Sequence, residues 1–247
     1  MDANFKQELL DFTNGVDQNN DGEIQVGEAL VITRLLLTNK SIASLKGIEA
    51  FKALEYLEFS ETQVNTIDIS KNIALTELLC SSNQLTALDV SANKALTFID
   101  CYSNKIASLD VSKNLALTEL ECSSNPIMIL DVSMNLLLND LRCAYIKITS
   151  LDVSKNLALK ELNCGYLKQL TSLDVSANNG LTVLNCCNNK INALDLSKNI
   201  ALTKLNCSDN QLTTLDVSKN LALTELVCCS NKLTELNVSN NKVLSNL

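Results

Sequence analysis

Residues 109–129 read LDVSKNLALTELECSSNPIMI and residues 215–235 read LDVSKNLALTELVCCSNKLTE, so a unit of 21 residues returns with its leucines, asparagines and cysteine in place. The unit begins at Ile67, Leu88, Leu109, Leu130, Leu151, Leu173, Leu194, Leu215 and Leu236, and one interval is 22 residues long. A unit this short cannot bury an apolar face alone, and stacking its copies gives a continuous core. The sequence therefore predicts a leucine-rich repeat solenoid.

Each unit contains an alternating apolar segment, such as Leu78 and Cys80, which is typical of a short strand with one side in the core. The 21 residues leave no room for a helix on the way back, so the return should be extended or tightly turned. We expect a parallel sheet of about ten coils. The first two coils are atypical, because Leu37 and Phe59 stand where later coils have cysteine.

The composition excludes several classes of function. The net charge of -8 argues against a nucleic-acid partner, which requires a basic patch. The sequence has no apolar run long enough for a membrane span, and its start lacks the features of a signal peptide. It also has no histidine and no glycine-rich phosphate loop, so we expect a protein that is not an enzyme.

Stacking in register places the cysteines in a column. Its members are Cys80, Cys101, Cys122, Cys143, Cys164, Cys186, Cys207 and Cys228. Neighbouring members point the same way from adjacent strands, which does not suit a relaxed disulfide, and their spacing does not suit a zinc site. We expect buried thiols that pack as small apolar groups. Cys187 and Cys229 follow the column by one residue and are expected to face outward.

Two columns of asparagine are predicted to satisfy backbone groups at turns. The first contains Asn83, Asn104, Asn125, Asn189, Asn210 and Asn231 and should point inward where each strand bends. Ile146 and Leu167 interrupt it, and the extra residue of the 22-residue unit lies in the second of these coils, so we expect a local irregularity. The second column starts at Asn72 and recurs in all nine units, on the far side of the coil.

An acidic column runs beside these turns. It contains Asp68, Asp89, Asp110, Asp131, Asp152, Asp174, Asp195 and Asp216, and ends at Asn237. Like charges at the spacing of adjacent coils repel one another, so each needs local compensation. Lysines three residues later, such as Lys71 and Lys113, are the expected partners. Solvated or turn-bonded carboxylates and a cation-binding strip are the alternatives.

Residues 17–28 read DQNNDGEIQVGE and match the twelve-residue EF-hand calcium loop. The predicted ligands are the side chains of Asp17, Asn19 and Asp21, the carbonyl of Glu23, a water held by Gln25, and both carboxylate oxygens of Glu28. A structural calcium site is expected. The alternative is a degenerate loop that is kept for its turn at Gly22.

Helices are expected on both sides of this loop, over residues 5–12 and 29–33. We therefore predict an N-terminal helical cap over residues 1–34 and the solenoid over residues 35–247. Leu244 and Leu247 match Leu223 and Leu226, so the last coil stops before its cysteine position. This predicts a fragment of a longer exported protein.

The cysteine-containing unit, together with SLKGIE at residues 44–49, resembles bacterial leucine-rich repeat proteins of the internalin type over residues 35–247. The resemblance implies a secreted or cell-surface protein whose curved sheet face binds a protein or glycan on a cell or matrix surface. An EF-hand-like cap before such repeats is similar to exported leucine-rich repeat proteins of Bacteroidetes-like bacteria. We expect a monomer.

The outward strand positions differ from coil to coil while the turn columns hardly vary, which favours a recognition module over a passive spacer or adhesin stalk. These positions are acidic overall and include Arg142. Tyr102, Tyr145 and Tyr166 lie just beyond them, and exposed aromatic side chains are favoured anchors at interfaces. We predict partner binding by these four residues. The alternative is that Tyr145 and Tyr166 merely cover a distorted turn.

Overall fold

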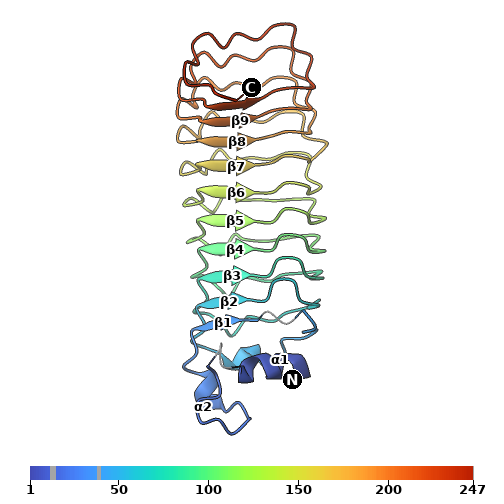
Figure 1. The fold of residues 1–247 in the computed structure, drawn as a ribbon, viewed down its shortest axis with the longest axis vertical. Coiled ribbons are helices and arrows are strands. Elements are labelled where there is room, and N and C mark those ends of the chain that lie inside the picture. Colours follow the sequence, from blue (N-terminus) through green and yellow to red (C-terminus); the bar gives the residue numbers. More distant parts are fainter. Residues whose placement is uncertain (12–14, 38–39, 247) are drawn as a thin grey trace.

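The computed structural model describes residues 1–11, 15–37 and 40–246, and its main feature is one parallel sheet of ten strands in chain order. Figure 1 shows them stacked from the N-terminal end upward. The strands are β1 (Arg34–Leu36), β2 (Tyr56–Glu58), β3 (Glu77–Leu79), β4 (Phe98–Asp100), β5 (Glu119–Glu121), β6 (Asp140–Arg142), β7 (Glu161–Asn163), β8 (Val183–Asn185), β9 (Lys204–Asn206) and β10 (Glu225–Val227). The predicted solenoid is confirmed.

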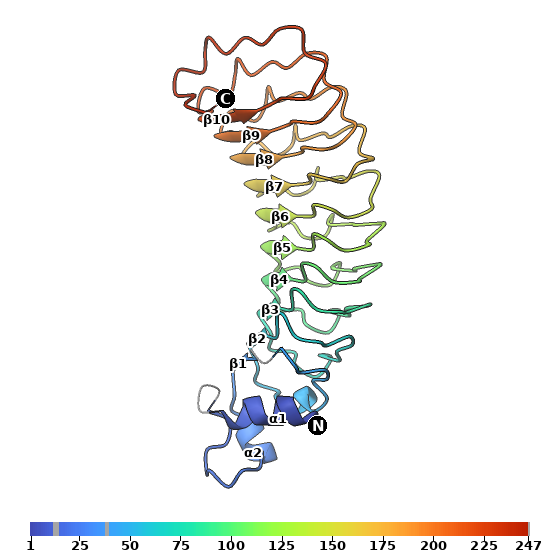
Figure 2. The same cartoon turned by 45° about the vertical axis from the view of Figure 1, so that its right-hand side comes forward.

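Each strand has three residues, and its middle residue enters the core while its two neighbours point outward. Leu78 of β3 lies opposite Ile99 of β4, which lies opposite Leu120 of β5, and all three are at most 1% exposed. This alternation follows from the pleat of a strand. The outward residues of all ten strands consequently share one face, which lies on the concave side of the curved rod in Figure 2.

The return segments contain tight turns, as predicted. In the coil of residues 109–129, the Asn114 N–H donates to the Val111 carbonyl at 3.0 Å and the Leu117 N–H donates to the Asn114 carbonyl at 3.1 Å. The Asn114 side chain is fully buried, and its Nδ2 donates to the carbonyls of Val90 and Asn93 in the preceding coil at 3.1 and 2.9 Å. Equivalent asparagines make these bonds in every unit, so this column binds successive coils together.

The inward-pointing asparagines at the strand ends are also confirmed. Asn104 Nδ2 donates to the carbonyls of Cys80 and Cys101 at 2.9 and 3.1 Å, and Asn104 Oδ1 accepts the N–H of Leu85 at 3.0 Å. Each such side chain therefore bridges two coils. Because buried peptide groups are costly without partners, these bonds explain why the residue type recurs.

The expected irregularity at Ile146 and Leu167 is confined to the turn. Both side chains are buried in place of an asparagine, and β6, β7 and β8 keep their register. The extra residue, Lys168, has a positive φ of 65°. No other described coil has a residue with positive φ at that point of its turn. Within the described residues, Asn189 Oδ1 in the next coil lacks a partner, because the insertion displaces the backbone that would donate to it.

The eight cysteines of the column are free thiols. Seven of them are buried, and Cys228, which follows β10, is half-buried. Burial raises the pKa of Cys164 and of Cys207 to about 12, so these thiols stay protonated. Cys229 is exposed, as predicted. The same prediction for Cys187 is wrong, because Cys187 is 4% exposed. Its Sγ occupies space that Gly165 leaves open, 3.1 Å from where a Cβ at Gly165 would lie.

Two short α-helices precede β1. Helix α1 spans Ala3–Leu10 and α2 spans Val26–Ala29, while a 3-10 helix, η1, spans Ile48–Ala50. Figure 1 shows α1 beneath the first coil, and its Phe5 and Leu9 are fully buried in the core. Among the described residues, none of the helices is long and apolar enough to cross a membrane.

The expected exit helix over residues 29–33 is wrong in position. Helix α2 begins inside the loop because the Glu28 carboxylate accepts the Gln25 N–H at 2.9 Å and starts the helix there. Residues 30–33, between α2 and β1, are not helical. Phe12 and Leu247, named in the predictions for the first helix and the last coil, lie outside the described residues.

Candidate functional site: a calcium-type loop and a concave recognition face

The loop of residues 17–28 is organised by its own side chains. Gly22 N–H donates to Asp17 Oδ2, Asp21 N–H donates to Asn19 Oδ1, and Glu23 N–H donates to Asp21 Oδ1, each at 2.9 Å. Gly22 has a φ of 82°, in the left-handed region that glycine adopts without strain. The oxygens of three predicted ligands are thus turned toward the interior of one loop.

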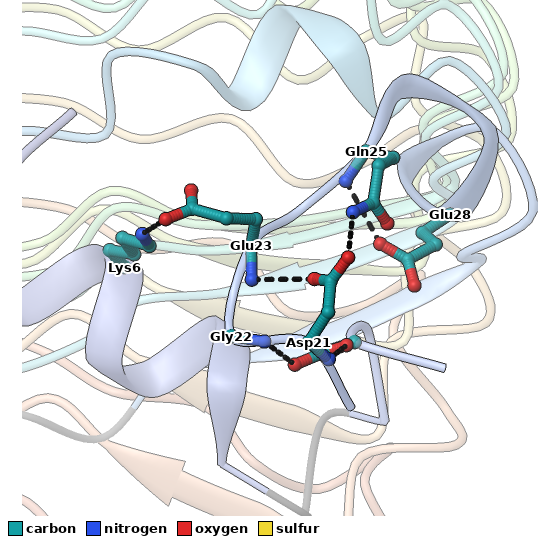
Figure 3. A network of polar contacts seen from close by, with 7 residues as sticks. Lys6, Asp21, Gly22, Glu23, Gln25 and Glu28 are labelled. Carbon is teal, nitrogen blue, oxygen red and sulfur yellow. Dashed lines mark hydrogen bonds and ion pairs between the residues drawn. The ribbon is translucent and has the colours of Figure 1, made fainter. Parts of the chain in front are cut away.

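Figure 3 shows how the rest of the loop joins this network. Gln25 Nε2 donates to Asp21 Oδ2 at 2.7 Å, and Glu28 Oε1 accepts the N–H of Gln18 at 2.8 Å, which ties the two ends of the loop together. The Glu23 side chain points away and pairs with Lys6 of α1 at 2.8 Å, so only its carbonyl could face an ion. The hydrogen bond from the Glu23 N–H lowers the pKa of Asp21, which keeps that carboxylate ionised.

The chemistry of these residues fits calcium, because every predicted ligand atom is an oxygen. The side chains of Asp17, Asn19, Asp21, Gln25 and Glu28 lie in one hydrogen-bonded network. In the described part of the chain, no three cysteine, aspartate or glutamate side chains are gathered closely enough to hold a metal ion by themselves. Binding here would therefore depend on the amide and carbonyl oxygens as well as on the carboxylates.

The acidic column is compensated mainly by hydrogen bonds within its own turns, and the expected lysines add a weaker charge interaction that also lowers the pKa of five of the aspartates. Asp131 Oδ1 accepts the N–H of Ser133 at 2.8 Å, and the same bond from a serine two residues later recurs along the column. These bonds lower the pKa of each of the eight aspartates. No ion pair joins any of these aspartates to a lysine in the described residues, so the hydrogen bonds within the turns are their main partners.

The concave face carries charged side chains at its centre. Arg142 of β6 binds Asp140 of the same strand through Nη2 at 2.6 Å and Nε at 3.2 Å, and Nη2 lies 3.9 Å from Glu161 of β7. These bonds raise the pKa of Arg142, mainly through Asp140. At the N-terminal end of the face, Arg34 lies 3.5 Å from the ring centroid of Tyr56, whose hydroxyl donates to Glu58.

The tyrosines lie beyond the C-terminal ends of the strands. Tyr145 and Tyr166 stack with their ring centroids 4.3 Å apart and their planes 10° apart, and Tyr145 is 52% exposed. Both have positive φ values, as do the serines at this position in other coils. Tyr102 is also exposed but occupies the preceding position of its coil, so it does not belong to the stack. Three of the four predicted partner residues, Arg142, Tyr145 and Tyr166, lie in neighbouring coils.

Sequence reasoning missed a row of exposed aliphatic residues on the outer side. Its members are Ile73, Leu115, Leu136, Leu157, Ile200 and Leu221, each more than half exposed. They follow the buried asparagine of each unit directly, which is the signal that could have identified them, because consecutive residues in such a turn do not both point inward. The half-burial of Asp100, Glu121 and Phe98 on the concave face was also missed.

Comparison with known proteins identifies the fold. No protein-family profile and no curated protein matches the chain. Among solved structures, it is similar to the functional domain of InlJ from Listeria monocytogenes, which includes a cysteine ladder, with a TM-score of 0.90 and 41% identity over 95% of this chain and 53% of that one. The chain thus spans about half the length of that structure.

Two more distant structures share the fold. An internalin, InlF, from Listeria monocytogenes aligns with a TM-score of 0.68 and 19% identity over 99% of this chain and 94% of that one. The ectodomain of the receptor kinase GASSHO1/SCHENGEN3 from Arabidopsis thaliana was solved in complex with Casparian strip integrity factor 2. It aligns with a TM-score of 0.60 and 21% identity over 83% of this chain and 25% of that one. The chain therefore has the leucine-rich repeat fold of internalin structures, with a column of cysteines along its core.

Proposed function

We propose that this chain is a non-enzymatic recognition module that binds another protein through the concave face of its sheet, outside the cell or at its surface. The observation that carries the proposal is the contrast between the core and turn positions and the outward strand positions. Core and turn residues repeat from coil to coil, whereas the outward strand residues change from Phe98 to Glu119, Asp140 and Val183. A passive spacer gives no reason for the outward strand positions to vary in size and charge.

The fold supports this use of the face. A curved stack of coils presents an extended concave surface, and the receptor kinase ectodomain with this fold was solved in complex with Casparian strip integrity factor 2. The stacked Tyr145 and Tyr166 and the cation Arg142 supply aromatic and arginine anchors of the kind that dominate binding energy at interfaces. A glycan is the alternative ligand, because tyrosine rings also stack on sugars.

The proposal can be tested by carboxylate footprinting of the whole chain with and without a bound peptide selected from a random display library. Glu119 and Glu161 on the concave face should be labelled at least threefold more slowly in the complex. Asp152 and Asp195, in the acidic column at the edge of the coils, serve as internal controls and should be labelled at the same rate. Protection of the control aspartates alone would contradict binding at the concave face.

The tyrosine pair is tested with the same peptides. Replacing Tyr145 and Tyr166 together by serine restores the residue that most other coils have and should raise the Kd about tenfold, as loss of an aromatic anchor does. The matched control replaces Ile200 and Leu221 of the outer row by serine and should leave the Kd within a factor of two. Equal Kd values for all three proteins would remove the tyrosines from the proposed interface.

We also propose that the loop of residues 17–28 binds one structural calcium ion. The support is the oxygen-only ligand set and the orientation of Asp17, Asn19 and Asp21 within the loop. Bound there, the ion would neutralise the carboxylates and hold α1 and α2 against the first coil. A single loop with a water-mediated ligand belongs to the weaker class, with a Kd of about 10⁻⁵ to 10⁻³ M.

Calorimetric titration of the whole chain with calcium should give one ion per chain. Asp21→Ala removes a ligand and should weaken binding at least tenfold, whereas Gln18→Ala, at an exposed position that is not a ligand, should leave affinity unchanged. Unaltered affinity in Asp21→Ala would show that the loop is retained only for its turn. More than one ion per chain would instead assign cations to the acidic column.

A further inference from the structure

A shallow hollow lies in the concave face over β4, β5 and β6. Its volume is about 90 Å³, and its lining consists of Phe98, Asp100, Glu119, Leu120, Glu121, Asp140 and Arg142. Four of these seven residues are carboxylates, and one is a cation. The space corresponds to about three water molecules. It is therefore wide enough for the tip of one side chain.

The cation of the hollow is already engaged. Arg142 forms two hydrogen bonds to Asp140, whose side chain is nearly buried, and its remaining ion-pair contact is to Glu161. Asp100 and Glu121 have no ion pair in the described part of the chain, and each accepts a backbone N–H, from Tyr102 at 2.9 Å and from Ser123 at 2.7 Å. Two negative groups thus face the hollow without an ion pair of their own, although the charge of the nearby Arg142 favours the ionised form of both.

Desolvation distinguishes these two carboxylates from the exposed aspartates of the acidic column. Desolvation raises the pKa of Asp100 and of Glu121, whereas serine hydrogen bonds lower the pKa of every aspartate in the acidic column. The column has more carboxylates, but they are exposed and satisfied within their own turns. The number of acidic residues alone therefore does not distinguish the hollow from the acidic column. The hollow combines half-buried negative charge, a concave shape and an aromatic wall.

We propose that the hollow receives a lysine or arginine side chain from a basic segment of the partner protein, a proposal that rests on the proposed function. The partner's charge would compensate Asp100 and Glu121, which face the space from adjacent strands. The half-buried ring of Phe98 offers an apolar wall for the stem of such a side chain and a face for its cation. The added positive charge would supplement that of Arg142, which forms its ion pairs with Asp140 and Glu161 and acts on Asp100 and Glu121 only from a greater distance.

A metal ion is not the occupant that this geometry favours. Among residues 1–11, 15–37 and 40–246, no three carboxylates or thiols converge as ligands, the hollow included. Carboxylates that are spread around a hollow suit a larger organic cation with several donors, such as a guanidinium or an ammonium group. Charge complementarity therefore points to a basic peptide segment.

The test uses fluorescent twelve-residue peptides built from Gly and Ser with three arginines, and counterparts in which the arginines are replaced by glutamine or glutamate. The whole chain should bind the arginine peptide at least tenfold more tightly than the glutamine peptide at low salt, and should not bind the glutamate peptide. The double variant Asp100→Asn with Glu121→Gln keeps the acceptors of the two backbone N–H groups. It should bind the arginine peptide at least fivefold more weakly than the original chain.

The matched control, Asp152→Asn with Asp195→Asn, removes the same amount of negative charge from the acidic column. Its fold should be retained because Asn237 accepts the equivalent serine N–H at 3.0 Å. The control should bind the arginine peptide within a factor of two of the original chain. Equal weakening in both double variants, or none in the first, would overturn the proposal. If library peptides still protect Glu119 and Glu161 in footprinting, the proposed binding at the concave face is retained. Only the proposal that the hollow receives a basic side chain is then rejected.

Discussion

Leu141→Ala is expected to lower the free energy of unfolding by about 3 kcal/mol, within the range that buried leucine truncations cause. Leu141 is the middle residue of β6, is fully buried, and lies in register between Leu120 and Leu162. Removing its isobutyl group leaves a cavity between two coils that are fixed by their own hydrogen bonds and cannot close around it. Equilibrium unfolding in urea, followed by circular dichroism, measures the change.

The matched control is Leu137→Ala, four residues earlier in the same coil. Leu137 is 55% exposed, and the equivalent residues Ala116 and Ala158 are already alanine in the neighbouring coils. Its truncation should change the free energy of unfolding by less than about 0.5 kcal/mol. A comparable loss in both variants would mean that the column of central leucines does not carry the stability assigned to it.

Asn178→Leu is expected to be destabilising by about 2–4 kcal/mol, because it removes two hydrogen bonds and leaves their acceptors buried. Asn178 is fully buried, and its Nδ2 donates to the carbonyls of Val153 and Asn156 at 3.1 and 2.9 Å. A leucine cannot donate to either carbonyl, and water cannot reach them. The same unfolding measurement applies.

The next residue provides the control for this change. Asn179 is exposed and occupies the position at which Leu157 and Ile200 stand in the adjacent coils. Asn179→Leu should therefore change stability by less than about 0.5 kcal/mol, although the chemical substitution is identical. If Asn178→Leu were no more destabilising than Asn179→Leu, the buried asparagine column would not hold the coils together.

Most of the fold was predictable because the repeat converts sequence position directly into place in the stack. Once Leu78 and Leu120 are aligned, their side chains must share one column, and so must Asn83 and Asn104. The predictions that failed depend on contacts that the repeat does not encode. Cys187 is buried because Gly165 in the preceding coil leaves room for its Sγ, and α2 starts early because Glu28 binds back to Gln25.

The candidate sites were predictable in residue type but not in environment. The ligand pattern of residues 17–28 can be read directly from its spacing, and the 21-residue separation of Tyr145 and Tyr166 places them in one column. The desolvation of Asp100 and Glu121 cannot be derived in this way. It depends on which side chains of β4, β5 and β6 line the hollow together, including Phe98 and Arg142.

The regular register of the strands makes the protein adjustable in length. Removing residues 67–87, one whole unit, would bring β2 beside β4 with Leu57 opposite Ile99, and every column would continue across the junction. The distance between the calcium-type loop and the hollow would shorten by one strand spacing, about 4.8 Å. The solenoid can thus act as a molecular ruler, in which gain or loss of whole units would set the distance between the two proposed sites without rebuilding either.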